Sequence, residues 1–249
     1  LVSWRLFSIS MRSFLFIFAI SSLSVYAVTI AGWACNNKYS LLGSLRASAQ
    51  MVSYEIPMGL SLIPIVMIFG TLDLNQIVAS QSAYPWSWGV VLAPVSFVIF
   101  LICMFAETNR APFDLAESEA ELVAGFHTEY GSLKMAMFFL AEYVDMFILS
   151  CLAATVFFGG WQLPFISHDL LMSVLDIPAL MSLNDTVFGG AVDIREILIA
   201  LFGLSVVLLK ALFFMWLYIW VRWTVPRFRY DQLMDMGWKF LLPVAVANV

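Results

Sequence analysis

The residues best suited to acid–base chemistry lie in one segment, Ala106–Tyr143, which reads AETNRAPFDLAESEAELVAGFHTEYGSLKMAMFFLAEY. Its seven carboxylates are Glu107, Asp114, Glu117, Glu119, Glu121, Glu129 and Glu142. Burial and like-charged neighbours both favour the protonated form of a carboxyl group, so a partly buried cluster can hold protons near neutral pH and pass them on. The segment is therefore compatible with a proton relay.

A second interpretation of the acidic segment is purely structural. Asp114 and Glu117 have the spacing of a capping box that opens a helix after Pro112. Glu117 and Glu121 are four residues apart and would share one face of that helix. Acids in a first turn are also favoured by the helix dipole. The pattern fits a solvated, well-capped loop helix, and the sequence leaves both interpretations open.

Four ionisable residues fall in or beside apolar runs, where a charge is costly and usually functional. Glu55, in SAQMVSYEIPMG, is either such a group or an interfacial glutamate that pairs with Arg46 or caps nearby backbone. Glu142 and Asp145 are three residues apart and share a helix face. Lys210, in VVLLKALFF, lies too deep to reach the interface easily, so we expect it to face a partner acid or a wet cavity.

A basic cluster, Arg222, Arg227 and Arg229, lies among aromatic residues in VRWTVPRFRYDQL. Arginine forms paired hydrogen bonds with anionic groups, so the cluster could recognise an anionic or quinone headgroup or dock an acidic partner. The preference of basic residues for the inner side of a membrane explains it equally well. No metal site is legible, because the cysteines and histidines are far apart: Cys35, Cys103, Cys151, His127 and His168.

The composition shows what kind of protein must position these groups. Of the 249 residues, 62% are hydrophobic and 12% are charged, about half the charge of a soluble domain. These values exclude a soluble enzyme, a disordered chain and a disulfide-rich secreted scaffold. A net charge of -5 and a pI near 4.9 argue against nucleic-acid binding, which needs a basic surface.

Long apolar runs predict an all-α polytopic bundle of transmembrane helices. Five complete spans are expected, at Ser13–Trp33, Ser48–Gly70, Trp88–Phe105, Met135–Phe158 and Glu196–Val221, and a truncated sixth begins near Gly237. We expect residues 1–249 to form a single transmembrane domain that is a fragment of a longer protein.

The distribution of basic residues predicts the orientation of these spans. Eight of the twelve fall on one side: Lys38, Arg46, Arg110, Lys134, Arg222, Arg227, Arg229 and Lys239. That side, with Trp33–Arg46 and the acidic loop 106–134, is expected to face the cytoplasm or the matrix of an organelle. The loop 161–193 is expected on the outer side.

Three motifs resemble one family in the same order along the chain. AETNRAPFDLAESEAELVAGFHTEYG is similar to the signature loop of the quinone-site membrane subunits of proton-pumping NADH:quinone oxidoreductase, respiratory complex I. AGWACNNKYSLLGSLRASAQMVSYE and RWTVPRFRYDQLMDMGWKFLLP also resemble that family. The resemblance extends from about Ser21 to the last residue.

This resemblance implies an architecture and a setting. The family has eight transmembrane helices, of which this chain would supply the third to the seventh and the start of the eighth. Quinone would be a bound substrate, no cofactor would be covalently attached, and NADH, flavin and iron–sulfur clusters would belong to partner subunits. The implied partners are peripheral-arm iron–sulfur and quinone-site subunits, small membrane subunits, antiporter-like subunits and the lipid bilayer. The implied location is the bacterial plasma membrane or the mitochondrial inner membrane.

The resemblance also implies roles for particular residues, none of them a metal ligand or a catalytic group. Coupling of NADH-driven quinone reduction to proton translocation would involve Glu55, Asp114, Glu117, Glu119, Glu121, Glu129 and Glu142. The quinone chamber and the peripheral interface would involve Arg46, Arg110, Arg222, Arg227, Arg229 and Asp231.

Two other functions compete with this one. The chain could be the membrane anchor of an energy-converting hydrogenase, in which protons replace quinone as the electron acceptor. It could also be a stand-alone ion transporter or a passive anchor. The RFRYDQL and HTEYG runs favour complex I over a hydrogenase. Stand-alone transporters often contain repeated halves with broken helices, and no such repeat is evident in the sequence.

Overall fold

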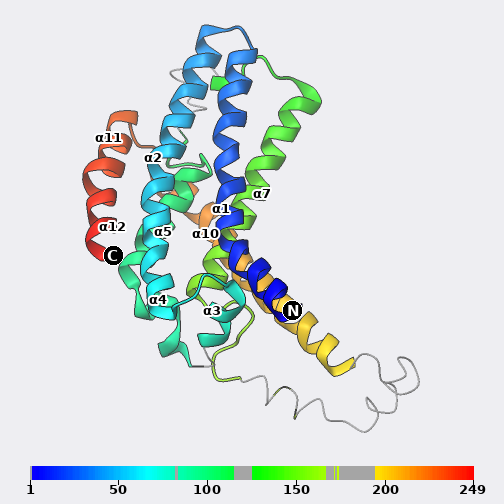
Figure 1. Ribbon diagram of the computed structural model, residues 1–249. Coiled ribbons are helices and arrows are strands. Elements are labelled where there is room, and N and C mark those ends of the chain that lie inside the picture. Colours follow the sequence, from blue (N-terminus) through cyan, green and yellow to red (C-terminus); the bar gives the residue numbers. More distant parts are fainter. Residues whose placement is uncertain (1, 82–83, 115–124, 167–170, 172, 174–193) are drawn as a thin grey trace.

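The computed structural model describes residues 2–81, 84–114, 125–166, 171, 173 and 194–249, and this part of the chain is dominated by helices (Figure 1). The longer helices are α1 (Val2–Ala34), α2 (Lys38–Phe69), α5 (Pro94–Glu107), α7 (Ser132–Phe157) and α10 (Ile194–Thr224). The shorter ones are α3 (Leu74–Ser80), η1 (Pro85–Ser87), α4 (Gly89–Leu92), η2 (Gly125–His127), α11 (Tyr230–Asp235), the π-helix η3 (Met236–Leu241) and α12 (Leu242–Asn248). The predicted all-α membrane bundle is thereby confirmed.

Four of the helices are long and apolar enough to cross a membrane: Leu15–Ala34, Lys38–Phe69, Ser132–Phe157 and Arg195–Thr224. They coincide with four of the predicted spans. The predicted third span, Trp88–Phe105, is instead divided between α4 and α5. The division falls at Pro94, the first residue of α5, because proline has no N–H to continue the hydrogen bonding of α4. With 14 residues, α5 is only about 21 Å long, shorter than the ~30 Å hydrocarbon core.

The turn between α1 and α2 is shorter than the sequence indicated. Trp33–Arg46 was expected to be a connecting segment, but α1 ends at Ala34 and α2 begins at Lys38. The side chain of Asn37 accepts a hydrogen bond from the Tyr39 N–H at 3.1 Å and so caps α2. The 32 residues of α2 extend about 48 Å, so the helix is longer than the membrane core is thick.

The two ends of the bundle are easily told apart (Figure 1). The α1–α2 turn, the chain after α5 and the start of α7 lie together at one end, which we call the inner end because the basic residues predict its side. Helices α3 and α4 and the end of α7 lie at the opposite, outer end. Helices α11 and α12 run along the edge of the bundle beside α2 and α5.

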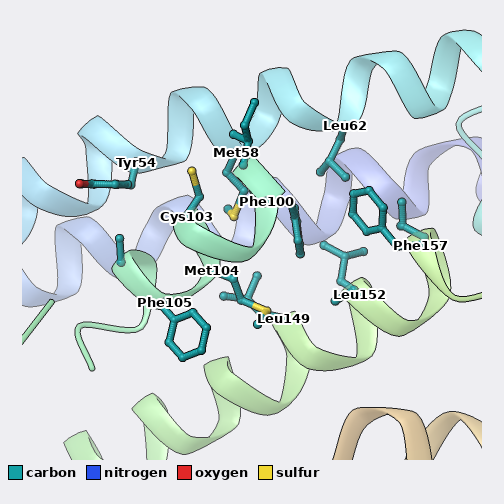
Figure 2. Close-up of a cluster of buried hydrophobic side chains, with 14 of the residues drawn as sticks. Tyr54, Met58, Leu62, Phe100, Cys103, Met104, Phe105, Leu149, Leu152 and Phe157 are labelled. Atoms are coloured by element: carbon teal, nitrogen blue, oxygen red, sulfur yellow. The ribbon is translucent and has the colours of Figure 1, made fainter. Parts of the chain in front are cut away.

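The core lies where α2, α5 and α7 meet. Figure 2 shows Met58 and Leu62 from α2 on one side of α5 and Leu152 from α7 on the other, with Phe100 and Met104 of α5 between them. All five residues are buried, and the most exposed of them, Leu152, is 4% exposed. Such packing holds α5 rigidly between its neighbours and so fixes the position of its last residue, Glu107.

Candidate functional site

Glu107 lies at the centre of the candidate site. It is the last residue of α5 and is 5% exposed. Neither carboxylate oxygen has a hydrogen-bond partner among the residues that the structure describes. A buried carboxylate at the negative end of a helix dipole, without a partner, is costly. Glu107 was counted in the acidic segment but was not among the predicted coupling residues, because the sequence did not show which of the acids is buried.

Two neighbouring cavities open beside this carboxylate. The first, of about 250 Å³, is lined by the acids Glu107, Glu142 and Asp145, together with apolar side chains of α1, α2 and α7. The second, of about 220 Å³, shares Glu107 and Asp145 with the first and continues along Leu149 and Leu152 toward the outer end. The two shared carboxylates therefore stand where the two cavities meet.

The structure brings two predicted site residues, Glu142 and Arg110, into contact. Arg110 Nη2 lies 3.3 Å from Glu142 Oε2, and the guanidinium also lies 4.5 Å from the centre of the Tyr143 ring. His127 Nε2 is 3.8 Å from Glu142 Oε1, and His127 is buried among Phe126, Phe138 and Phe139. His127 was not predicted as a site residue, and its only sequence signal was its place in the HTEYG run.

Glu55 lies on α2 and faces a different space. It lines a wide apolar groove of about 580 Å³ between α1 and α2, and it is not among the residues that line the two cavities beside Glu107. Arg46, which the sequence offered as the alternative partner of Glu55, lies with its guanidinium 5.5 Å from the centre of the Tyr230 ring.

The chain after α5 is tied to the end of α10 at the inner end of the bundle. Asp114 Oδ2 lies 3.3 Å from Arg227 Nη2, so a predicted coupling residue and a predicted interface residue form an ion pair. The Phe228 N–H donates to the Pro112 carbonyl at 3.2 Å, and the Phe113 and Phe228 rings are stacked 5.5 Å apart. Two aromatic rings and a backbone hydrogen bond thus support this ion pair.

The other predicted residues take less central positions. Glu129 accepts a hydrogen bond from Asn37 Nδ2 at 2.8 Å, at the exposed α1–α2 turn. Arg229 and Asp231 are 4.0 Å apart and about four-fifths exposed, and Arg222 is exposed. Ion pairs between exposed side chains contribute little to the stability of a protein. Glu117, Glu119 and Glu121 lie outside the described residues, so their roles and the capping box stay predictions.

Lys210 corrects one expectation. The sequence predicted a partner acid or a wet cavity. Instead, its ammonium donates to three backbone carbonyls, those of Phe158 at 2.7 Å, Gly160 at 2.7 Å and Gln162 at 2.6 Å. The Trp88 ring lies on another side, with its centre 5.1 Å from Nζ. Backbone carbonyls at the end of a helix can satisfy an ammonium without a carboxylate, which no side-chain pattern indicates.

In the described ranges, no group of three or more histidine, cysteine, aspartate or glutamate side chains is arranged to hold a metal ion. The buried carboxylates of the site are groups that can hold and transfer protons.

A model of one protein family, described as NADH dehydrogenase, matches residues 3–249. The chain belongs to the NADH dehydrogenase family. This confirms the resemblance inferred from the three sequence motifs. The match to the family model extends over nearly all of this chain, so it includes every element of the candidate site.

Three bacterial relatives, each of them one subunit of NADH-quinone oxidoreductase, illustrate the similarity. The chain is 48% identical over 238 residues to the relative from Flavobacterium psychrophilum, an alignment covering 96% of this chain and 63% of that protein. It is 50% identical over 232 residues to the relative from Salinibacter ruber, covering 92% and 62% of the two chains. It is 48% identical over 236 residues to the relative from Rhodothermus marinus, covering 94% and 64%. This family member spans less than two thirds of the length of these curated relatives.

Proposed function

We propose that this chain is part of a membrane subunit of NADH-quinone oxidoreductase, respiratory complex I, and that it couples quinone reduction to proton translocation. The family and the names of the three relatives support the assignment to this enzyme rather than to a hydrogenase anchor or a stand-alone transporter. NADH oxidation, flavin and iron–sulfur clusters belong to partner subunits in this proposal, and quinone is a substrate.

The observation that carries the proposal is the position of the Glu107 carboxylate. It is buried, it lacks a hydrogen-bond partner in the described structure, and it shares two cavities with Asp145. Ionisable groups held together in this way titrate as a set, so a proton bound by one lowers the cost of charge on another. Intramembrane carboxylates of this kind are typical of proton pathways.

The inner end of the bundle supplies the connection to quinone in this proposal. Arg110 and His127 both contact Glu142, which shares a cavity with Glu107 and Asp145. In this proposal, a change of charge near the inner surface alters the electrostatic field at these carboxylates through Glu142. Arg227 anchors the chain around Asp114 to α10. We assign to this end a share of the wall of the quinone chamber, with Arg46, Arg110, Arg222, Arg227, Arg229 and Asp231 as its polar residues.

The test compares two variants of the intact enzyme reconstituted in liposomes. Glu107→Gln keeps the shape of the side chain but cannot lose or carry a carboxyl proton. Glu196→Gln is the matched control, because Glu196 is exposed near the start of α10 at the outer end. The measured quantities are NADH:quinone activity and the acidification that accompanies it. We expect Glu107→Gln to lower both at least tenfold, and the control to lower neither. Normal activity and acidification in Glu107→Gln would contradict the proposal.

A further inference from the structure

The outer half of the bundle contains a cation held by unusual partners. The Lys210 ammonium donates to the carbonyls of Phe158, Gly160 and Gln162, which follow the end of α7. Gly159 and Gly160 have φ values of 71° and 52°, a left-handed turn that glycine adopts readily. Lysine carries three N–H donors, so three carbonyls satisfy its protonated form completely.

An aromatic cluster is connected to this cation through Phe158. Its members are Phe97 and Phe100 from α5, Phe157 from the end of α7, Phe158 directly after it, and Phe214 from α10. Ring centres are 5.3 Å apart for Phe97 and Phe157, 5.4 Å for Phe100 and Phe157, and 5.4 Å for Phe158 and Phe214. Phe100, Phe157 and Phe214 are at most 1% exposed. Because Phe158 supplies both a ring to the cluster and a carbonyl to Lys210, the two features form one unit.

This unit lies nearer the outer end of the bundle than the carboxylates do. Phe158, at the C-terminal end of α7, is 13 positions after Asp145, which corresponds to about 20 Å along the helix. The described hydroxyl groups at this level are tied to their own helices or to Asn248. Ser61 donates to Met58, Ser150 to Met146 and Thr155 to Leu152, while Ser96 accepts from Asn248. They do not form a continuous chain of hydrogen bonds in the described part of the bundle.

We propose that Lys210 and the five phenylalanines form an outer barrier, which prevents protons held by Glu107 and Asp145 from leaving through the outer end of this chain. An apolar constriction excludes water, and a fixed cation in a low-dielectric region repels a proton. Protons therefore enter the carboxylate set from the inner end and leave it sideways, toward neighbouring subunits. The role of the barrier rests on the proposed proton-carrying function. Its low permeability to protons is a separate property that can be measured without quinone reduction.

The experiment measures passive proton flux without NADH or quinone. The intact enzyme is reconstituted in phosphatidylcholine liposomes that contain a pH-sensitive dye, and a potassium diffusion potential with valinomycin drives protons inward. Lys210→Met removes the charge and leaves three carbonyls for water to bind. Lys210→Met combined with Phe214→Ser also opens the aromatic cluster. Lys210→Arg keeps the charge, and Lys134→Met removes an exposed lysine at the opposite end of α7.

We expect the proton flux to rise severalfold in Lys210→Met and about tenfold or more in the double variant. The flux of Lys210→Arg and Lys134→Met should equal that of the unaltered enzyme. If Lys210→Met prevents assembly, Phe214→Ser alone tests the barrier, because it leaves the Lys210 contacts in place. Unchanged flux in Phe214→Ser and in every assembled variant that lacks the lysine would overturn the barrier. Because no NADH is present, this result is independent of the Glu107→Gln outcome.

Discussion

Glu107 and Asp145 reach the same two cavities from different helices, Glu107 from the end of α5 and Asp145 from α7. Asp145 was recognised in the sequence only as a residue that shares a face with Glu142. In the structure it lines both the cavity at the inner end and the cavity that continues deeper into the bundle. Its position makes it a member of the carboxylate set.

Replacing Asp145 should therefore weaken proton transfer. Asp145→Asn removes one proton-binding group, yet Glu107 and Glu142 remain in the first cavity. We expect acidification per NADH to fall by a smaller factor than in Glu107→Gln, with quinone reduction partly retained. Dye quenching in proteoliposomes measures this ratio. Asp235→Asn is the control, because Asp235 is exposed and paired with Lys239 at 2.8 Å. An unchanged ratio in Asp145→Asn would remove that residue from the set.

The Gln50 side chain should be essential for stability near the site. It is fully buried, and its Nε2 donates to the carbonyls of Ala106 and Phe113, both at 2.9 Å. Gln50→Leu would leave these two carbonyls unpaired, at a cost of about 1–3 kcal/mol each. We expect a lower thermal midpoint for the solubilised enzyme and lower activity, because Ala106 precedes Glu107. Gln76→Leu on α3 should change the midpoint much less. Equal midpoints for both variants would show that these hydrogen bonds contribute little.

Gly43 should tolerate no side chain. A methyl group there would lie 2.7 Å from the Cα of Gly125, so η2 and His127 would have to move. We expect Gly43→Ala to lower NADH:quinone activity and to destabilise the protein by about 1–3 kcal/mol. Gly59→Ala is a matched control on the same helix, because no atom lies within 4 Å of its added methyl group. The prediction fails if both alanine variants show the same activity and thermal midpoint.

The Asp114–Arg227 ion pair should make a modest, salt-dependent contribution. The Arg227 side chain is 56% exposed, so solvent screens much of the attraction. We expect Arg227→Ala to lower kcat/KM for quinone by no more than about fivefold at low salt, and by less at high salt. If Asp114 is the partner that matters, Asp114→Asn combined with Arg227→Ala should cost less than the two single changes together. Strict additivity would show that the residues act independently.

The sequence predicted the broad architecture well because a long run of apolar residues is sufficient to identify a membrane span. Apolar runs located the ends of the four long helices and the starts of α7 and α10 to within a few residues. They placed the start of α1 at Ser13 instead of Val2, and they also placed the start of α2 too late. That start was placed at Ser48, since Lys38 and Arg46 interrupt the apolar run, although both belong to the helix. The break before α5 was missed for a similar reason. A proline inside an apolar run ends a helix without changing hydropathy.

The site could be predicted only in outline. The motifs identified Glu142 and Arg110, which the structure brings within 3.3 Å. They did not single out Glu107, because burial depends on how α5 packs against its neighbours. Lys210 was expected beside an acid or a wet cavity, but its partners are backbone carbonyls of a turn distant in sequence. A side-chain pattern contains no information on carbonyl directions.

The central claim is that Glu107 carries a proton whose binding responds to quinone reduction. Difference infrared spectroscopy of the intact enzyme, between oxidised and reduced quinone, tests it most directly, because a protonated carboxyl group has its own C=O stretching band. The account predicts a carboxyl band that shifts or changes intensity on reduction, disappears in Glu107→Gln and persists in Glu196→Gln. A carboxyl band unchanged by Glu107→Gln, or the lack of any such band in the unaltered enzyme, would contradict it.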